Sequence, residues 1–217
     1  LYIETVGYHI NQKYTRKSQE GRCYYAGNLS ENEFSYKNSY DEFFADINAL
    51  SSIYDNFYKF DISNFFDGID IDLLFKLINN REEILDTRSS LIYKRLLQQI
   101  GGNKFPTVEN SATLSYLATY IYLDEVDNDL ETILKKNSKI ESFQIIRYVD
   151  DLYIFFDTME DELNLVSSEI KNAVIDVHRK VKLNLNENKT KLDKSSEVNR
   201  TLNAALYNHY VNKEDID

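Results

Sequence analysis

Two adjacent carboxylates, Asp150 and Asp151, interrupt the strongest strand signal in the chain. The runs on either side, 143–149 and 152–156, are rich in the β-branched and aromatic residues that favour strands. The pattern therefore predicts a β-hairpin with acids at its turn. Because Asp is a common turn residue, a solvated turn is one interpretation. The other is that the hairpin presents its carboxylates to a metal ion, which requires a further acid elsewhere in the chain.

A second strand signal also ends on an acid. Residues 57–62 (FYKFDI) predict a buried strand that carries Asp61 near its end. A tight turn at 63–69 follows, and a helix begins at Asp70 with acids in its first turn, where the helix dipole favours them. If this strand pairs beside the hairpin, Asp61 meets the two hairpin acids. Carboxylates brought together in this way repel one another at neutral pH unless cations neutralise them.

Three clustered carboxylates offer the hard oxygen ligands that suit Mg²⁺ or Mn²⁺. Two such ions about 4 Å apart can activate an attacking hydroxyl and stabilise a pyrophosphate leaving group. The acids therefore predict phosphoryl or nucleotidyl transfer, with two Mg²⁺ (or Mn²⁺) ions as the cofactor.

The rest of the chain predicts an α+β fold. Apolar residues at helical spacing predict helices at 40–54, 70–78, 91–100, from Pro106 to 134, and at 163–181. Acids at 124–129 make the second half of the Pro106 helix less distinct. A short strand at 182–186 is expected to pair with one that starts at 189–192. This order predicts an antiparallel sheet backed by helices on one face.

Composition limits the class of protein. The chain has 217 residues, 42% of them apolar, so we expect one folded unit. No apolar run approaches the roughly 20 residues of a membrane span, and the single Cys23 excludes an internal disulfide. We therefore expect a cytoplasmic protein with no membrane partner. The net charge of −11 has the wrong sign for nucleic-acid binding over the whole surface, so such contacts must be local, metal-mediated or supplied by other segments.

The acidic motifs resemble those of reverse transcriptases. Residues 148–151 (YVDD), between two apolar strands, resemble the family's YxDD motif. Residues 60–69 (FDISNFFDGI) resemble its preceding acidic motif, in the form found in bacterial group II intron, retron and abortive-infection enzymes. Residues 185–190 (LNENKT) resemble a downstream stretch. The three motifs occur in the family's order and cover 57–192, most of a polymerase palm. The resemblance implies an RNA-directed DNA polymerase that uses dNTPs and binds DNA, with RNA as a further candidate partner.

The resemblance also implies roles for the charged residues. Asp61 and Asp150 would hold the metal ions, and Asp151 would support them. Lys189 would protonate the departing pyrophosphate, because a cation there matches the charge that develops on the leaving group. The alternative for Lys189 is a solvated lysine in a charged turn.

The resemblance further implies a dNTP pocket after the first acid. The backbone of Ile62, Ser63, Asn64 and Phe65 would face the triphosphate. The ring of Phe66 would clash with a 2′-hydroxyl and so favour dNTPs over NTPs. The alternative for Phe66 is a core residue next to Phe65.

The helix after Pro106 departs from the family pattern. Intron and retron enzymes begin it with a Pro-Gln-Gly-rich segment whose glycines allow close backbone approach, whereas this chain has Glu109-Asn110-Ser111. The departure resembles abortive-infection and related phage-defence reverse transcriptases, some of which extend DNA without a template and prime from a protein hydroxyl. The leading hypothesis is therefore metal-dependent DNA synthesis in bacterial anti-phage defence. An ordinary RNA-templated retron or intron enzyme, and a catalytically degenerate palm that acts as an assembly module, are the alternatives.

The same comparison divides the chain into three parts. We expect a partial fingers-like segment at 1–56, the palm at 57–200, and a tail or the start of a following domain at 201–217. The chain begins at Leu1 rather than Met, so we expect the remaining domains, including most of the thumb, in a longer chain. Those domains are expected partners, and an oligomer is left open.

Overall fold

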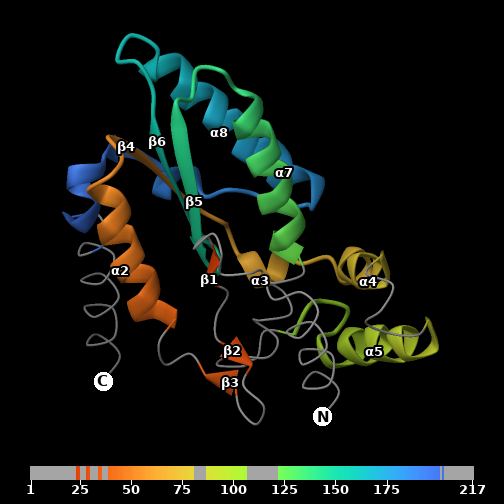
Figure 1. Cartoon of the computed structure of the whole chain (residues 1–217). Helices are drawn as coiled ribbons and strands as arrows, with labels where there is room; N and C mark the ends of the chain where they lie inside the picture. The colour runs from red at the N-terminus through yellow and green to blue at the C-terminus, as the bar shows by residue number, and fades with distance from the viewer. Residues whose placement is uncertain are drawn as a thin grey trace.

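The structure is a computed structural model that describes residues 23–24, 28–29, 34–35, 39–80, 87–106, 122–200 and 202. Its elements are β1 (Cys23–Tyr24), β2 (Asn28–Leu29), β3 (Phe34–Ser35), α2 (Ser39–Ser51), β4 (Asn56–Asp61), α3 (Phe65–Gly68), α4 (Ile71–Asn80), α5 (Thr87–Ile100), α7 (Leu123–Lys136), β5 (Ser142–Tyr148), β6 (Asp151–Asp157), α8 (Leu163–Lys180), η3 (Glu187–Lys189), β7 (Lys191–Lys194) and η4 (Ser195–Glu197) (Figure 1). No helix in these ranges is long and apolar enough to cross a membrane. Residues 107–121, which include the first half of the helix predicted after Pro106, lie outside the described part.

The main sheet has the strand order β1-β5-β6-β4-β7. Strands β5, β6, β4 and β7 pair antiparallel, and only the short β1 joins β5 in parallel. Strands β2 and β3 form a separate antiparallel pair. The hairpin predicted over 143–156 is β5 and β6, so the α+β fold with an antiparallel palm sheet is confirmed.

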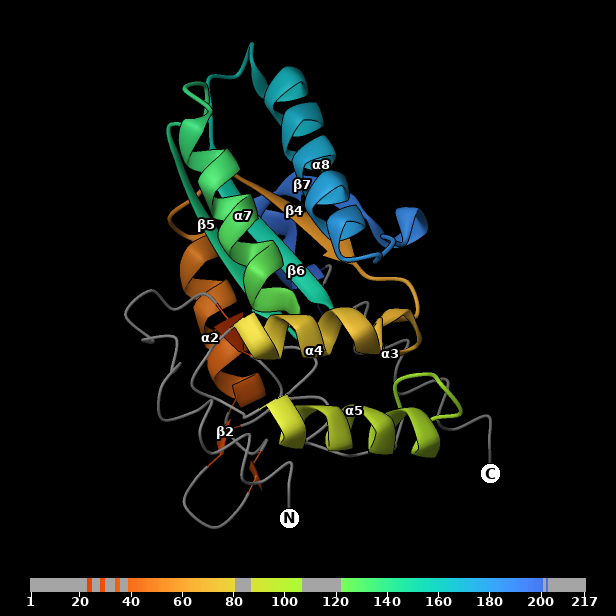
Figure 2. The ribbon, with the colours of Figure 1, turned by 90° about the vertical axis from the view of Figure 1, so that its right-hand side faces the viewer.

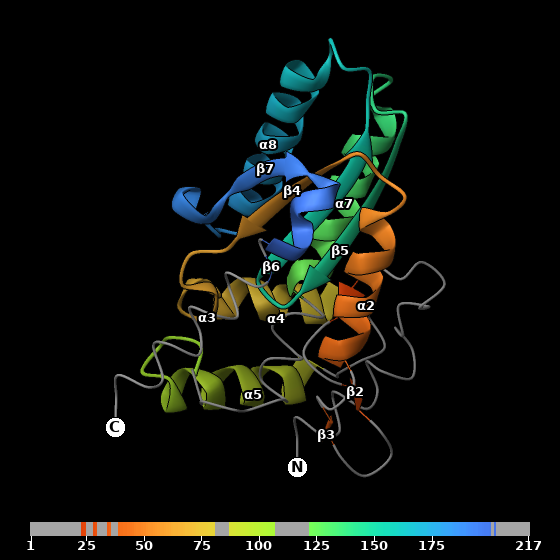
Figure 3. The same ribbon diagram turned by 90° about the vertical axis from the view of Figure 1, so that its left-hand side faces the viewer.

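Both faces of the main sheet are covered. Helices α7 and α8 lie across one face (Figure 2), and α2 lies against the other (Figure 3). On the α2 side, Phe43 and Ile47 pack with the strand residues Phe57, Tyr153 and Phe155. The prediction of helices on a single face was therefore incomplete. Apolar spacing over 40–54 identifies a helix, but the face that it covers is decided by contacts far away in the sequence.

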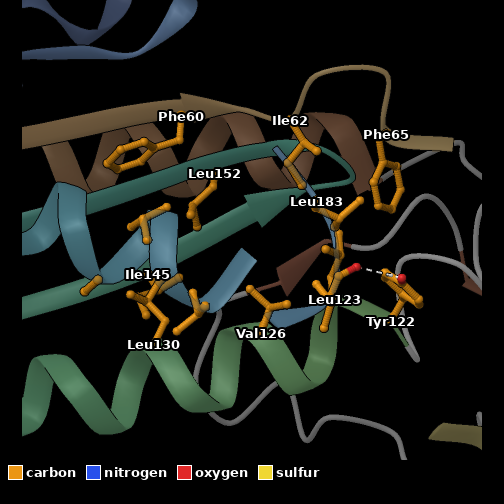
Figure 4. Packing of buried hydrophobic residues seen from close by; sticks show 14 of the residues in the cluster. Phe60, Ile62, Phe65, Tyr122, Leu123, Val126, Leu130, Ile145, Leu152 and Leu183 are labelled. Atoms are coloured by element: carbon orange, nitrogen blue, oxygen red, sulfur yellow. Dashed lines mark hydrogen bonds between the residues drawn. The ribbon is translucent and has the colours of Figure 1, made fainter. Parts of the chain in front are cut away.

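The larger core lies between the sheet and the helices α7 and α8. Strand residues Phe60, Leu152 and Ile145 pack against Val126 and Leu130 of α7 (Figure 4). From α8, the apolar residues that recur at helical spacing are buried, as predicted: Val166, Ile170, Val174 and Val177. Each such buried aliphatic side chain stabilises the fold by about 1.5–3 kcal/mol. This core fixes the two strands that carry the predicted catalytic acids.

Helix α5 ends where the sequence predicts, at the pair Gly101-Gly102. A Cβ on Gly101 would lie 1.8 Å from the carbonyl oxygen of Lys104, so only glycine fits there. Gly102 has a φ of 59°, in the left-handed region that glycine adopts without strain.

The predicted pairing of 182–186 with a strand starting at 189 was wrong. Strand β7 (191–194) pairs with β4, and Leu185 makes an isolated bridge to Ile62 just beyond the end of β4. Both segments therefore follow the same edge of one strand, and the short η3 joins them. The edge of β4 offers unpaired hydrogen-bonding groups to both segments, which a local pattern of alternating residues does not reveal.

Candidate active site

The two acidic motifs meet because β4 and β6 are neighbours. In the register of this pair, Asp61 lies opposite Asp151. Tyr148 pairs with Asp151 in the hairpin, so Val149 and Asp150 form its two-residue turn. Of the predicted metal ligands, Asp61 therefore lies at the end of β4, Asp151 lies at the start of β6, and Asp150 lies in the turn that joins β5 to β6. The meeting of Asp61 with the hairpin acids follows from strand order, as expected.

The turn has a backbone conformation that is unusual for its sequence. Val149 has a φ of 53°, in the left-handed region. A β-branched residue pays a steric cost there, and such residues persist only where surrounding contacts hold them. Arg147 supplies one of these contacts, since its Nη1 donates to the Val149 carbonyl at 3.5 Å.

The carboxyl of Asp150 is strongly affected by its surroundings. Burial raises its pKa to about 6, with a further contribution from the adjacent Asp151 and a smaller one from Asp61, while Lys189 opposes the rise. The other two predicted acids and the predicted lysine thus all act electrostatically on Asp150. Concentrated negative charge with one carboxyl shifted towards neutrality is typical of a site completed by cations.

Two lysines contact Asp61 and Asp151. Lys189 Nζ lies 3.2 Å from Asp61 Oδ1, and Lys59 Nζ lies 3.2 Å from Asp151 Oδ1. Lys189 was predicted to belong to the site, whereas Lys59 was not. The signal for Lys59 was its position two residues before Asp61 on a strand, which places both side chains on the same face.

Lys189 reaches Asp61 because the segment before it follows β4. The amide of Asn186 donates to the Asp61 carbonyl at 2.8 Å, and the amide of Lys189 donates to the Asn186 carbonyl at 3.1 Å. The buried Tyr122 anchors the start of this segment, because its hydroxyl donates to the carbonyl of Val181 at 2.7 Å (Figure 4) and accepts from the amide of Asp70 at 3.2 Å. Burial raises the pKa of Tyr122 to about 12, so the hydroxyl keeps its proton.

The predicted nucleotide pocket is built on a tight turn. Asn64 has a φ of 47°, a conformation that Asn tolerates. The side chains of Ile62 and Phe65 are buried in the core, so any contact of theirs with a nucleotide would be through the backbone. The amide of Ser63 donates to the Asn184 carbonyl at 2.8 Å and is thus already engaged within the protein. Phe66 is half-buried and packs against Phe65, with its ring centroid 5.0 Å away.

The donor set suits Mg²⁺ or Mn²⁺, since three carboxylates offer only hard oxygen atoms. Within the described residues, no three carboxylate, imidazole or thiol groups are arranged so as to hold an ion. Asp61 and Asp151 each contact a lysine ammonium group. The oxygen donors of these residues therefore suit divalent ions, provided that at least one lysine moves away from its carboxylate.

A buried polar cluster lies on the opposite side of the hairpin from these lysines. Arg147 of β5 is fully buried, and its Nε and Nη2 donate to Asp127 of α7 at 2.8–3.0 Å. Its Nη2 also lies 3.4 Å from Nε2 of the buried His178 of α8. The sequence did not predict this cluster, although the acids at 124–129 that make the predicted helix less distinct include Asp127, the partner of Arg147.

His178 is neutral in this cluster. Its Nδ1 lies 2.7 Å from the Val174 carbonyl, which requires a proton on Nδ1 and leaves Nε2 as the acceptor from Arg147. Burial lowers the pKa of His178 to about 4, and the charge of Arg147 adds to the effect. The cluster thus contains the cation Arg147 and the anion Asp127. Its hydrogen bonds link α7, β5 and α8 next to the hairpin turn.

Comparisons with known proteins agree with this geometry. A search of curated proteins found no match to the chain. A family model described as "Reverse transcriptase (RNA-dependent DNA polymerase)" matches residues 28–200, which include the acidic strand end, the hairpin and the segment that carries Lys189. This match covers most of the chain, and the matched region holds the antiparallel sheet with its acids at one end. The chain belongs to the reverse transcriptase family.

Proposed function

We propose that this chain is the catalytic palm of a DNA polymerase that transfers nucleotides from dNTPs. The observation that carries the proposal is the register of β4 and β6, which sets Asp61 opposite Asp151 with Asp150 in the adjoining turn. Membership of the reverse transcriptase family supports the same chemistry. RNA-directed DNA synthesis is the activity that the family description names.

In the proposed mechanism, Asp61 and Asp150 hold the metal ions and Asp151 supports the site. Two Mg²⁺ (or Mn²⁺) ions would supply activation of the attacking hydroxyl and stabilisation of the pyrophosphate. The raised pKa of Asp150, about 6, indicates a carboxyl whose charged form gains from a nearby cation. Lys189 has a side chain that is 63% exposed, so it can leave Asp61 and donate a proton to the departing pyrophosphate.

We further propose that Phe66 selects dNTPs. The ring is half-buried and lies 6.4 Å from that of Phe105, centroid to centroid, at an interplanar angle of 14°. A ring held in this way cannot move aside for a 2′-hydroxyl without losing its aromatic contacts. Steric exclusion is therefore the proposed basis for discrimination against NTPs.

The proposed biological role and mode of priming rest on the resemblance of the sequence to particular groups of reverse transcriptases. The unusual sequence at 109–111 supports a role in bacterial anti-phage defence, with synthesis that is template-independent or primed from a protein hydroxyl. The division into a fingers-like part at 1–56, a palm at 57–200 and a tail at 201–217 belongs to the same proposal, as does a cytoplasmic location.

Supplying the full-length protein with each labelled dNTP separately, without a template, tests the finer proposal. Product attached covalently to the protein supports protein-primed, untemplated synthesis. Incorporation that needs an RNA template and follows its sequence would instead support an ordinary retron or intron enzyme. The Asp150→Asn variant is the control for contaminating polymerase, since it lacks a proposed metal ligand.

A degenerate palm that serves as an assembly module is the second candidate. The observation in its favour is that both Asp61 and Asp151 are engaged by lysines. In that case neither Mg²⁺ nor Mn²⁺ binds at the acids, and no dNTP is incorporated under any of these conditions. Titration of the protein with Mn²⁺ separates the two candidates before a substrate is known.

A further inference from the structure

The two lysines at the acids differ in how firmly they are held. The side chain of Lys189 is 63% exposed, whereas that of Lys59 is 12% exposed. Lys59 lies on β4, an internal strand of the sheet with β6 on one side and β7 on the other. Its Nζ also lies 5.4 Å from the centroid of the Tyr153 ring, which is itself buried. A cation packed over an aromatic face and beside a carboxylate has little freedom to leave.

The ammonium group of Lys59 contacts one particular acid, Asp151. Lys59 lies opposite Tyr153 in the register of β4 and β6, so Asp151 is its diagonal neighbour on the same face, with the two charged groups 3.2 Å apart. The lysine that contacts Asp61 and acts electrostatically on Asp150 is instead Lys189.

We infer that Lys59 is a positioning residue that holds Asp151 as its own counter-ion and so keeps it out of the metal ligand set. The assignment rests on the proposed metal role of the acids. Three carboxylates and two ammonium groups leave one net negative charge at the site, and the departure of Lys189 leaves two. Asp61 and Asp150 then carry the charge that divalent ions neutralise, while the pair of Lys59 with Asp151 stays intact.

The inference predicts a distinct pattern of Mn²⁺ affinities, measured by titration of the full chain without nucleotide. Lys59→Met frees the Asp151 carboxylate, so Mn²⁺ binding tightens by about three- to tenfold. Asp151→Asn leaves the ammonium group uncompensated and weakens binding. The double variant removes both charges and returns the affinity to within about twofold of the unchanged chain.

Lys191→Met is the matched control. Lys191 lies opposite Lys59 in the register of β4 and β7, but its ammonium group contacts Asp193 at 2.9 Å. This variant removes the same charge from the neighbouring strand and leaves Mn²⁺ affinity unchanged. Lys59→Arg keeps the charge and retains the original affinity. Thermal unfolding of each metal-free variant checks folding, and Lys59→Gln replaces Lys59→Met if the latter does not fold.

Three results would overturn the inference. If the double variant binds Mn²⁺ as weakly as Asp151→Asn, Asp151 is itself a ligand. If Lys191→Met tightens binding as much as Lys59→Met, the effect is one of overall charge. If Lys59→Met and Lys59→Gln leave the Mn²⁺ affinity unchanged, Lys59 does not influence metal binding at the acids. Two other results would contradict the proposed function itself: the unchanged chain does not bind Mn²⁺, or Asp150→Asn binds Mn²⁺ equally well. Either result would also overturn the inference about Lys59.

Discussion

Asp61 of β4 lies directly opposite Asp151 of β6, although several helices and strand β5 separate the two residues in the sequence. The pairing brings the ends of two buried strands together at one point of the sheet. Side-chain direction in a strand alternates, so a slip of one residue would send one carboxylate to the opposite face. The buried residues on both faces of β4 and β6 oppose such a slip, and the core thereby fixes the geometry of the proposed site.

Replacing Phe66 by Ala is expected to admit NTPs. The change removes the ring that packs beside Phe65 and Phe105, and with it the proposed clash with a 2′-hydroxyl. We expect the ratio of dNTP to NTP incorporation to fall by about tenfold or more, equivalent to ~1.4 kcal/mol of lost discrimination. Phe66→Tyr keeps the ring and should keep the ratio. Unchanged discrimination in Phe66→Ala would assign the residue to the core alone.

Replacing Arg147 by Met is expected to destabilise the fold severely. The change removes the guanidinium group from the buried ion pair with Asp127, and removing one member of a buried pair typically costs about 3–5 kcal/mol of unfolding free energy. Urea denaturation measures the loss. Lys180→Met is the matched control, because it breaks an exposed ion pair with Asp129 and should cost about 1 kcal/mol or less. Similar losses in both variants would argue against a buried ion pair.

The neutral His178 predicts that the fold weakens in acid. Its pKa is about 4 in the folded chain, against 6.5 ordinarily, so the unfolded chain binds the proton more readily. The contribution of His178 to the unfolding free energy is therefore complete above pH 6.5 and is lost as pH falls towards 4. The loss amounts to about 3 kcal/mol at most.

His178→Gln tests this dependence, because glutamine can still donate to the Val174 carbonyl and accept from Arg147. Unfolding free energies of this variant, measured by urea denaturation at pH 7 and pH 4.5, should differ less than those of the unchanged chain. Equal differences in the two proteins would mean that His178 does not titrate as described.

Replacing Tyr122 by Phe removes a single hydroxyl. The change leaves the buried carbonyl of Val181 without its donor and the amide of Asp70 without its acceptor. An unsatisfied buried group costs about 1–3 kcal/mol, which thermal denaturation can detect. Because Tyr122 anchors the segment that leads to Lys189, amide hydrogen exchange should also quicken at 182–189. Faster exchange throughout the chain, without a local effect at 182–189, would contradict this anchoring role.

The sequence predicts those parts of the fold that local patterns determine. The apolar spacing of α8, the two apolar runs of the hairpin and the glycine pair after α5 each correspond to an observed element or boundary. The meeting of Asp61 with the hairpin acids was also predicted, on the expectation that the two strands pair, because an acid that ends one strand lies beside an acid that begins its antiparallel neighbour.

Other features depend on contacts between distant residues. Arg147 was predicted only as part of a strand, since no local pattern links it to Asp127 and His178. Lys59 reads as an ordinary alternating residue of β4 until Asp151 is placed beside it. The arrangement of 182–194 along β4 was mispredicted for the same reason, because pairing with a strand edge far away in the sequence prevailed over a local hairpin.

The most direct test of the proposed function is dNTP incorporation by the full-length protein with and without Mg²⁺ or Mn²⁺, compared between the unchanged chain and Asp150→Asn. The control is Asp176→Asn, the same substitution on the exposed face of α8. The proposed function predicts metal-dependent incorporation in the unchanged chain and in Asp176→Asn, and its loss in Asp150→Asn by at least about a hundredfold. Normal incorporation by Asp150→Asn would contradict the assignment of these acids as the catalytic centre.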